Sequence, residues 1–122
     1  MQGEFMDKNL QNALDFANYQ QTFSIQRKTL KEKINAKLTY GINGGVFRID
    51  RELMVFVDSL CSNGRTSGVV LLDSNDSPIL IDNLETFKDE IFSRYFESTN
   101  EYYEQFQTLK KSRSVEKLLG ND

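Results

Sequence analysis

The sequence predicts an α+β fold in which two long terminal helices flank a small antiparallel sheet. Residues 4–40 contain neither glycine nor proline, and their apolar side chains recur at helical spacing. The middle of the chain holds short alternating segments separated by turn residues, and a second long helical pattern follows them. We expect a single domain, residues 1–122, because a chain of this length can bury about 65–70% of the surface that its unfolded form exposes.

The first predicted helix spans residues 7–36, and a break near Thr22 is left open. Its apolar residues lie on two lines: Leu10, Leu14 and Ala17 on one, and Phe16, Phe23, Leu30 and Ile34 on the other. The second half of this helix is basic, with Arg27, Lys28, Lys31, Lys33 and Lys37. Cations near the end of a helix complement the helix dipole, so this cluster needs no ligand to explain it.

The first predicted hairpin follows in residues 37–50. Side chains alternate in residues 37–42 and again in residues 45–50, on either side of Asn43-Gly44. Because Asn-Gly adopts the positive φ angles of a type I′ turn at little cost, this is the clearest local signal in the chain.

A short helix from Arg51 to Cys61 is predicted between two hairpins. Asp50 is suited to cap its N-terminus, and the helix ends near Gly64. The same stretch also alternates as a strand through Leu53, Val55 and Val57. The caps and the length favour the helix.

The second predicted hairpin joins an apolar strand, residues 69–72, to a strand that starts at Pro78 and ends at Ile81. Residues 62–68 form a loop before it, and residues 73–77 form its turn. We expect the two hairpins to form one small antiparallel sheet, with the short helix between them.

The C-terminal helix is predicted over residues 83–119, with Asp82 or Asn83 as its N-cap. Its apolar stripe is long and aromatic: Leu84, Phe87, Ile91, Tyr95, Tyr102, Phe106 and Leu109, widened by Phe92, Phe96 and Tyr103. The pattern weakens at residues 112–114, where Ser114 is suited to cap a separate last turn.

Composition argues against an enzyme. The chain has no histidine, so it lacks imidazole nucleophile partners and imidazole metal ligands, and the lone Cys61 can form neither an internal disulfide nor a thiolate zinc site. Residues 73–77 resemble a calcium loop in their alternating oxygens, but Pro78 and Leu84 stand where that loop needs glycine and glutamate. We therefore expect no catalytic residue, no metal site and no cofactor.

Two groups of side chains are candidates for contact with a partner. Basic residues that could meet nucleic acid or another anion are Arg27, Lys28, Lys31, Lys33, Arg65, Lys110, Lys111 and Arg113. Aromatic residues that could form a protein interface are Phe92, Phe96, Tyr102, Tyr103 and Phe106. Because the C-terminal stripe is longer than a small sheet can cover, part of it should pack on another helix, of this chain or of a second copy.

Three segments carry a resemblance to a known group of proteins: residues 47–53, residues 70–79 and the tail at residues 110–118. Together they resemble a small uncharacterised protein that recurs in contractile-tailed phages of marine cyanobacteria and in ocean metagenomes. The resemblance implies a viral accessory or virion-associated protein that acts inside an infected bacterium. It brings no catalytic motif.

The leading hypothesis is a non-enzymatic protein that oligomerises or docks on a protein partner through its long helices. A nucleic-acid-binding regulator is the first alternative, and a ligand binder that uses Arg48, Tyr40 and Asp50 is the second. No apolar run approaches the ~20 residues of a membrane span, so we expect no membrane contact. The polar N-terminus indicates a cytoplasmic protein, in the host cell or in the virion if it is viral.

Overall fold

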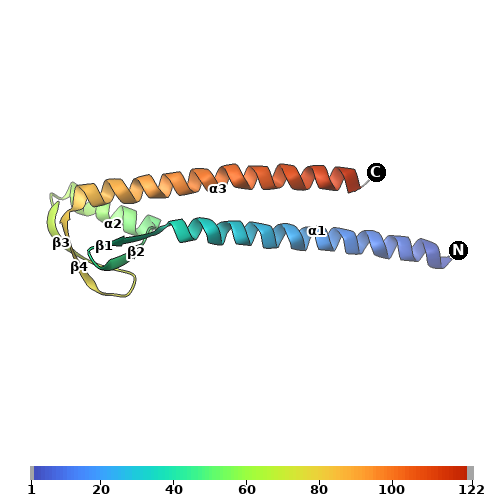
Figure 1. The fold of residues 1–122 in the computed structure, drawn as a ribbon, viewed down its shortest axis with the longest axis horizontal. Helices are drawn as coiled ribbons and strands as arrows, with labels where there is room; N and C mark the ends of the chain where they lie inside the picture. Colours follow the sequence, from blue (N-terminus) through green and yellow to red (C-terminus); the bar gives the residue numbers. More distant parts are fainter. Residues whose placement is uncertain (1, 121–122) are drawn as a thin grey trace. The chain divides into compact units, whose positions relative to one another are not determined.

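The computed structural model describes residues 2–120, and the side chains of residues 7–112. Its elements are, in order, α1 (Gln2–Lys37), β1 (Thr39–Ile42), β2 (Gly45–Arg48), α2 (Arg51–Ser62), β3 (Ser67–Leu72), β4 (Pro78–Asn83) and α3 (Leu84–Gly120) (Figure 1). The predicted α+β class, with a long helix on each side of two hairpins, is confirmed.

Contacts divide the chain into two compact units. The helical unit comprises Met1–Glu32 and Gln105–Asp122, and the hairpin unit comprises Lys33–Glu104. Helices α1 and α3 contribute residues to both units. The single domain expected from the sequence stays a prediction.

Helix α1 is longer than predicted and has no break. It starts at Gln2 rather than Asp7, and it continues through Thr22 to Lys37. A single threonine lowers helix propensity by less than about 0.7 kcal/mol, which the good helix formers around it offset. Within the helical unit, the Phe23 ring of α1 packs on the Phe106 ring of α3, with centroids 6.4 Å apart.

The first hairpin forms as predicted. Asn43 and Gly44 both have positive φ angles, 51° and 81°, as a type I′ turn requires. The turn sets the register, in which Ile42 lies opposite Gly45 and Tyr40 lies opposite Phe47. Every second residue of β2 is buried, so the strand presents Phe47 to the core and Val46 to the outside.

Residues 51–62 form a helix, which decides the alternative left open by the sequence. The Asp50 carboxylate accepts a hydrogen bond from the Leu53 N–H at 2.8 Å, as an N-cap does. Met54 and Val57 are buried on one face of α2, whereas Val55 is exposed. A strand would instead place Val55 and Val57 on the same face.

The two hairpins form two separate two-stranded sheets, so the prediction of one sheet is wrong. Within residues 2–120, strand β2 has no neighbouring strand on its outer edge. There the N–H of Val46 donates to the Asp73 carboxylate at 2.9 Å, and the N–H of Arg48 donates to the Ser74 hydroxyl at 3.0 Å. Side chains of the β3–β4 turn therefore accept hydrogen bonds from backbone N–H groups of β2 that a neighbouring strand would otherwise have paired.

Helix α3 starts as predicted but ends differently. Asn83 is the N-cap, because its side-chain oxygen accepts a hydrogen bond from the Thr86 N–H at 3.1 Å. The helix then runs to Gly120 without interruption, so Ser114 is not the cap of a separate turn. Serine is only mildly unfavourable inside a helix, and neither glycine nor proline occurs in α3 before Gly120.

The core of the hairpin unit lies where both hairpins and α2 meet the first half of α3 (Figure 1). The rings of Phe47 and Phe87 meet edge to face with centroids 5.2 Å apart. Both are buried, together with Ile49, Met54, Val57, Leu71, Ile79, Ile81, Leu84 and Ile91. One continuous cluster thus joins β2, α2, β3, β4 and α3, and Tyr40 and Ile42 of β1 pack against it.

Asp73 joins the two hairpins. Its Oδ1 accepts hydrogen bonds from the N–H groups of Asn75 and Ser77, and its Oδ2 accepts one from Val46 in the other hairpin. The residue is only 8% exposed. These backbone N–H groups lower the pKa of Asp73 below its ordinary value, because they stabilise the ionised carboxylate.

We expect substitution of Gly45 to destabilise the hairpin unit. A Cβ at this position would lie 2.5 Å from Cγ1 of buried Ile79, so Gly45→Ala overpacks the contact between the hairpins and should cost about 1–3 kcal/mol of unfolding free energy. The control is Gly41→Ala, whose Cβ would meet only the Gly45 carbonyl oxygen, at 3.8 Å. Urea denaturation followed by circular dichroism compares them. Equal stability of the two variants would contradict this packing.

We expect Asp73→Asn to lower the melting temperature at pH 7 more than Asp76→Asn, a change in the same turn. An amide has one acceptor oxygen, so at least one of the three N–H groups would face an NH₂ group. The folded-state pKa of Asp73 is lowered, so its stabilising contribution is present above about pH 4 and is lost as pH falls through the lowered pKa. The difference in melting temperature between wild type and Asp73→Asn should therefore shrink towards about pH 2. A difference that is independent of pH would contradict this role.

Candidate functional site

The five aromatic residues predicted as an interface lie on different faces of α3. Phe96 is 54% exposed and Tyr103 is 64% exposed. Phe92 is half-buried and packs on Phe96, with ring centroids 6.3 Å apart. Since positions 92, 96 and 103 fall within a narrow arc of a helix, these three residues form one stripe, here called the α3 stripe. Tyr102 and Phe106 are half-buried and lie off this stripe.

Helix α1 has a comparable stripe in the helical unit. Leu10, Leu14 and Ile25 are all at least half exposed. Their spacing places them on one face of the helix, nearly opposite Phe23, which packs on α3. Helix α1 thus has apolar residues on two faces, and the face that carries Leu10, Leu14 and Ile25 is exposed.

The predicted basic residues are only partly gathered. Within the helical unit, the Arg27 guanidinium and the Lys110 ammonium both lie over the Phe106 ring, at 5.8 and 5.6 Å from its centroid. Lys28, Lys31 and Lys111 are exposed. Lys33 and Arg65 are exposed in the hairpin unit, and the side chain of Arg113 lies outside the described residues.

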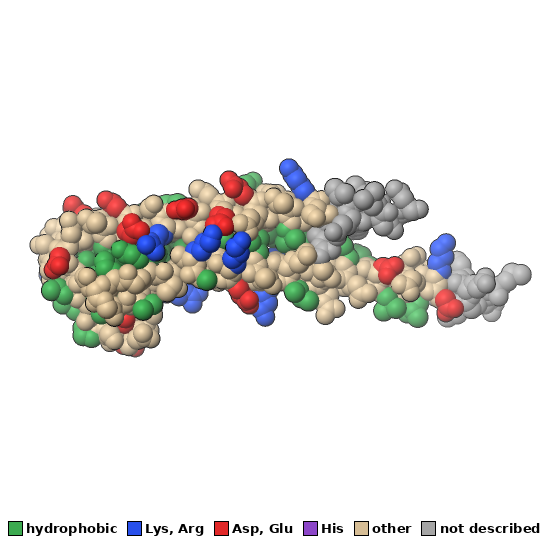
Figure 2. Space-filling model, in the orientation of Figure 1, with side chains coloured by type: hydrophobic (Ala, Val, Ile, Leu, Met, Phe, Trp, Pro, Cys, Tyr) green, Lys and Arg blue, Asp and Glu red, His purple; other side chains and the backbone are tan. Residues whose placement is uncertain are grey.

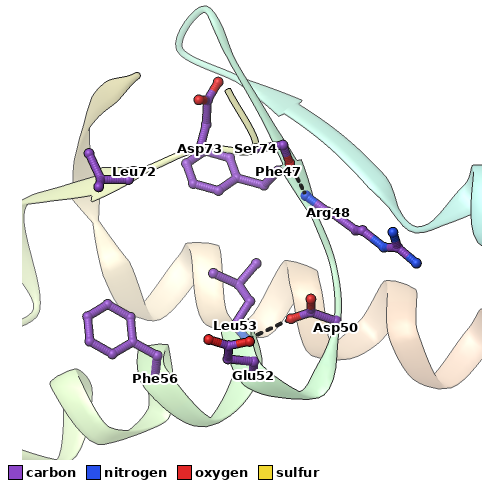
Figure 3. Close-up of a pocket in the computed structure, with 9 residues that line it drawn as sticks. All are labelled: Phe47, Arg48, Asp50, Glu52, Leu53, Phe56, Leu72, Asp73 and Ser74. Atoms are coloured by element: carbon purple, nitrogen blue, oxygen red, sulfur yellow. Dashed lines mark hydrogen bonds between the residues drawn. The ribbon is translucent and has the colours of Figure 1, made fainter. Parts of the chain in front are cut away.

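A cavity of about 400 Å³ opens between α2, the end of β3 and the end of β2 (Figure 3). It contains two of the three residues predicted for a ligand pocket, Arg48 and Asp50. Tyr40 is not among its lining residues. Instead, the Tyr40 ring lies 4.3 Å from the Arg94 guanidinium and packs against Phe87.

The polar groups of this cavity are largely used by the fold. The Asp50 carboxylate caps α2, and the Asp73 carboxylate accepts three backbone N–H groups. The Arg48 guanidinium points away from the apolar wall that Leu53, Phe56 and Leu72 form (Figure 3). The cavity is therefore better suited to apolar side chains than to acid–base chemistry.

A second cavity, of about 570 Å³, lies on the other side of Phe56. Leu60, Val69 and Val70 supply its apolar wall, and Arg65, Thr66 and Ser67 supply polar groups from the loop between α2 and β3. Sequence reasoning predicted a connecting loop here and considered Arg65 as an anion contact. The structure places it at one end of an apolar surface.

Sequence reasoning missed that surface, the outer face of the second hairpin. Val70 is 58% exposed and Leu72 is 63% exposed on β3, and exposed Leu80 lies opposite Val70 on β4. Figure 2 shows exposed hydrophobic side chains scattered among other atoms at the hairpin end of the visible face. The signal in the sequence was the unbroken apolar run of residues 69–72, because a strand with one solvated face alternates.

Cys61 is half-buried. Burial raises the pKa of its thiol, so it is a weak nucleophile near neutral pH. Among residues with described side chains, no three Cys, Asp or Glu residues gather closely enough to bind a metal ion.

No helix in the described part of the chain has the length and apolarity needed to cross a membrane.

Comparison with known proteins gives no relative: no family model, no curated protein and no solved structure matches this chain.

Proposed function

We propose that this chain is a non-enzymatic protein–protein interaction or assembly protein that self-associates through its long helices. The observation that carries the proposal is the α3 stripe, in which Phe96 and Tyr103 expose most of their rings beside half-buried Phe92. Aromatic side chains are enriched where proteins bind one another, because they bury a large area at low entropic cost. A stripe of this width fits the side of a second helix.

The helical unit supports the same proposal independently. Helix α1 carries Leu10, Leu14 and Ile25 on a face that its own unit leaves exposed. A helix with apolar residues on two faces is stabilised when both faces are covered. Association of copies would cover the second face.

The test of self-association is the mass of the protein in solution as a function of concentration, measured by sedimentation equilibrium. Wild type is expected to form a dimer or higher oligomer at micromolar concentrations. The double variant Phe96→Ala/Tyr103→Ala should weaken association about tenfold or more, because buried aromatic residues are common hot spots.

The matched control is Glu97→Ala/Asn100→Ala, which truncates two exposed polar side chains on the same turns of α3. It should leave the association constant unchanged. A wild-type chain that stays monomeric across the concentration range would contradict self-association, and equal losses in both double variants would contradict the role of the stripe.

The narrower proposal is a phage accessory or virion-associated protein, in the cytoplasm of an infected cell or in the virion. It is supported by the resemblance of residues 47–53, 70–79 and 110–118 to a small protein of marine cyanophages. Mass spectrometry of purified virions tests it, and absence of the protein from particles would leave only the intracellular role.

A nucleic-acid-binding regulator is the second candidate function. It is favoured by one observation: Arg27 of α1 and Lys110 of α3 lie over the same ring in the helical unit. The exposed residues Lys28, Lys31 and Lys111 belong to the same unit. Together they would place several cations near one another, as phosphate contacts require.

Filter binding of DNA and RNA at rising salt concentration tests this candidate. Each phosphate contact should contribute about −0.9 to the slope of log affinity against log salt for duplex DNA. Lys28→Glu/Lys111→Glu should lower affinity and flatten that slope, whereas the same change at Lys8, an exposed cation far along α1, should matter less. No retention at low salt would exclude this function.

A further inference from the structure

The hairpin unit contains a strand with one free edge. Strand β3 pairs only with β4, and no other strand in residues 2–120 lies along its outer edge. At the outer edge of β4, the Asn43 side chain donates a hydrogen bond to the Leu80 carbonyl at 2.9 Å. The two outer edges of the β3–β4 sheet thus differ: a side chain binds a carbonyl on the β4 edge, and no other described strand pairs with the β3 edge.

The register shows which backbone groups face the free edge. The Leu80 carbonyl points away from β3, so Leu80 and its partner Val70 form a non-hydrogen-bonded pair. The N–H and C=O groups of Val70 therefore point outward, as do those of Leu72 two residues on. Gly68, with a φ angle of 61°, interrupts the regular edge before Val70.

Helix α2 lies beside β3, and two cavities with both apolar and polar lining residues lie between them. The two cavities, of about 400 and 570 Å³, share Phe56 of α2 as a common wall. One reaches Leu72 and the other reaches Val70. We call this pair of cavities the α2–β3 groove.

The two ends of the groove differ in charge. Arg65 lies at the end where β3 begins, and the other residues that line this cavity are uncharged. Glu52 and Asp50 lie at the end where β3 finishes, with Arg48 across from them. An acidic group suits the first end, and a basic group suits the second.

We propose that the α2–β3 groove binds an extended peptide segment of a partner protein, which adds to the free edge of β3 as an antiparallel strand. Backbone pairing with Val70 and Leu72 supplies affinity, and the cavities beside Phe56 take alternate apolar side chains. The peptide carries a basic residue at its N-terminal end, near Glu52, and an acidic residue or its own carboxylate near Arg65.

A peptide fits this groove better than β3 of a second copy does. In a second copy, β3 already has β4 along one edge, so a two-stranded sheet would have to enter the space beside α2. The groove is also distinct from the α3 stripe, with which it shares no residue. The peptide site goes beyond the proposed self-association and does not depend on it.

The probe is a fluorescein-labelled peptide, Lys-Thr-Val-Thr-Val-Thr-Glu, and the assay is fluorescence anisotropy. Its charge-reversed isomer, with Glu first and Lys last, is expected to bind about tenfold more weakly. The double variant Arg65→Glu/Glu52→Lys should reverse this preference. If both peptides bound equally well to both proteins, the proposed orientation of the peptide, with its N-terminal end near Glu52 and its C-terminal end near Arg65, would be overturned.

Val70→Pro tests the backbone pairing. Proline removes an N–H group that faces the free edge and breaks no hydrogen bond to β4, so the hairpin should persist. Peptide affinity should fall about tenfold or more, while the control Val70→Thr, which keeps the N–H group, should retain binding. Wild-type affinity in Val70→Pro would overturn the proposal.

A second measurement applies if Val70→Pro unfolds. With wild-type protein, peptide binding should slow hydrogen exchange at the N–H groups of Val70 and Leu72. Unchanged exchange at saturating peptide would overturn strand addition, as would a peptide that binds equally well with every amide methylated.

Two further outcomes distinguish the peptide site from the α3 stripe and from strand pairing between copies. Phe96→Ala/Tyr103→Ala should keep full peptide affinity, so loss of self-association would leave the peptide site standing. A wild-type dimer that Val70→Pro converts to a monomer would assign the edge of β3 to a second copy and overturn the peptide proposal.

Discussion

The hydrogen bond from the Val46 N–H to the Asp73 carboxylate links the two hairpins. Each hairpin alone is two strands, and a two-stranded sheet is marginal in water. One oxygen of Asp73 orders its own turn, and the other accepts the N–H of Val46 from the first hairpin. Gly45 leaves room beside Asp73 and Ile79 for this approach. The buried ring of Phe47 then meets Phe87, and the core closes around α3.

That arrangement also determines which edges stay free. Asp73 and Ser74 bind the outer edge of β2, and Asn43 binds the outer edge of β4. No described residue does the same for β3. Folded proteins usually protect the free edge of an apolar strand with charged residues, proline or a covering segment. The unpaired backbone groups of such an edge can otherwise pair with a strand of another chain. Val70 and Leu72 leave this edge without such protection, which is why we propose that it binds a partner.

The proposed interaction surfaces share one physical origin, a surplus of apolar residues over what a small core can bury. The hairpin unit covers one face of the β3–β4 sheet, with Leu71, Ile79 and Ile81, and leaves the other face exposed. Helix α3 likewise buries Phe87 and Ile91 but exposes Phe96 and Tyr103. The composition is consistent with this surplus, since the chain contains nine Phe and five Tyr residues.

Local signals predicted the elements well. Asn43-Gly44 specified a type I′ turn, Asp50 specified the start of α2, and Asn83 was one of two predicted caps for α3. Each of these three signals acts through backbone geometry or through a hydrogen bond between residues at most three apart. The incorrect expectations concerned longer stretches of the chain. A cap at Ser114 and a single sheet were expected, and a break near Thr22 was left open; the structure instead has two continuous long helices and two separate sheets.

The sequence by itself thus determined the helices, the turns and the α+β class, because periodicity, caps and turn residues act over short stretches of chain. Only the tertiary structure decided which edges are paired and which apolar faces are covered. Those outcomes depend on residues far apart in sequence, such as Val46 with Asp73 and Asn43 with Leu80. The same apolar run, residues 69–72, supplies a core residue in Leu71 and exposed side chains in Val70 and Leu72, and only the packing of β3 against its neighbours distinguishes them.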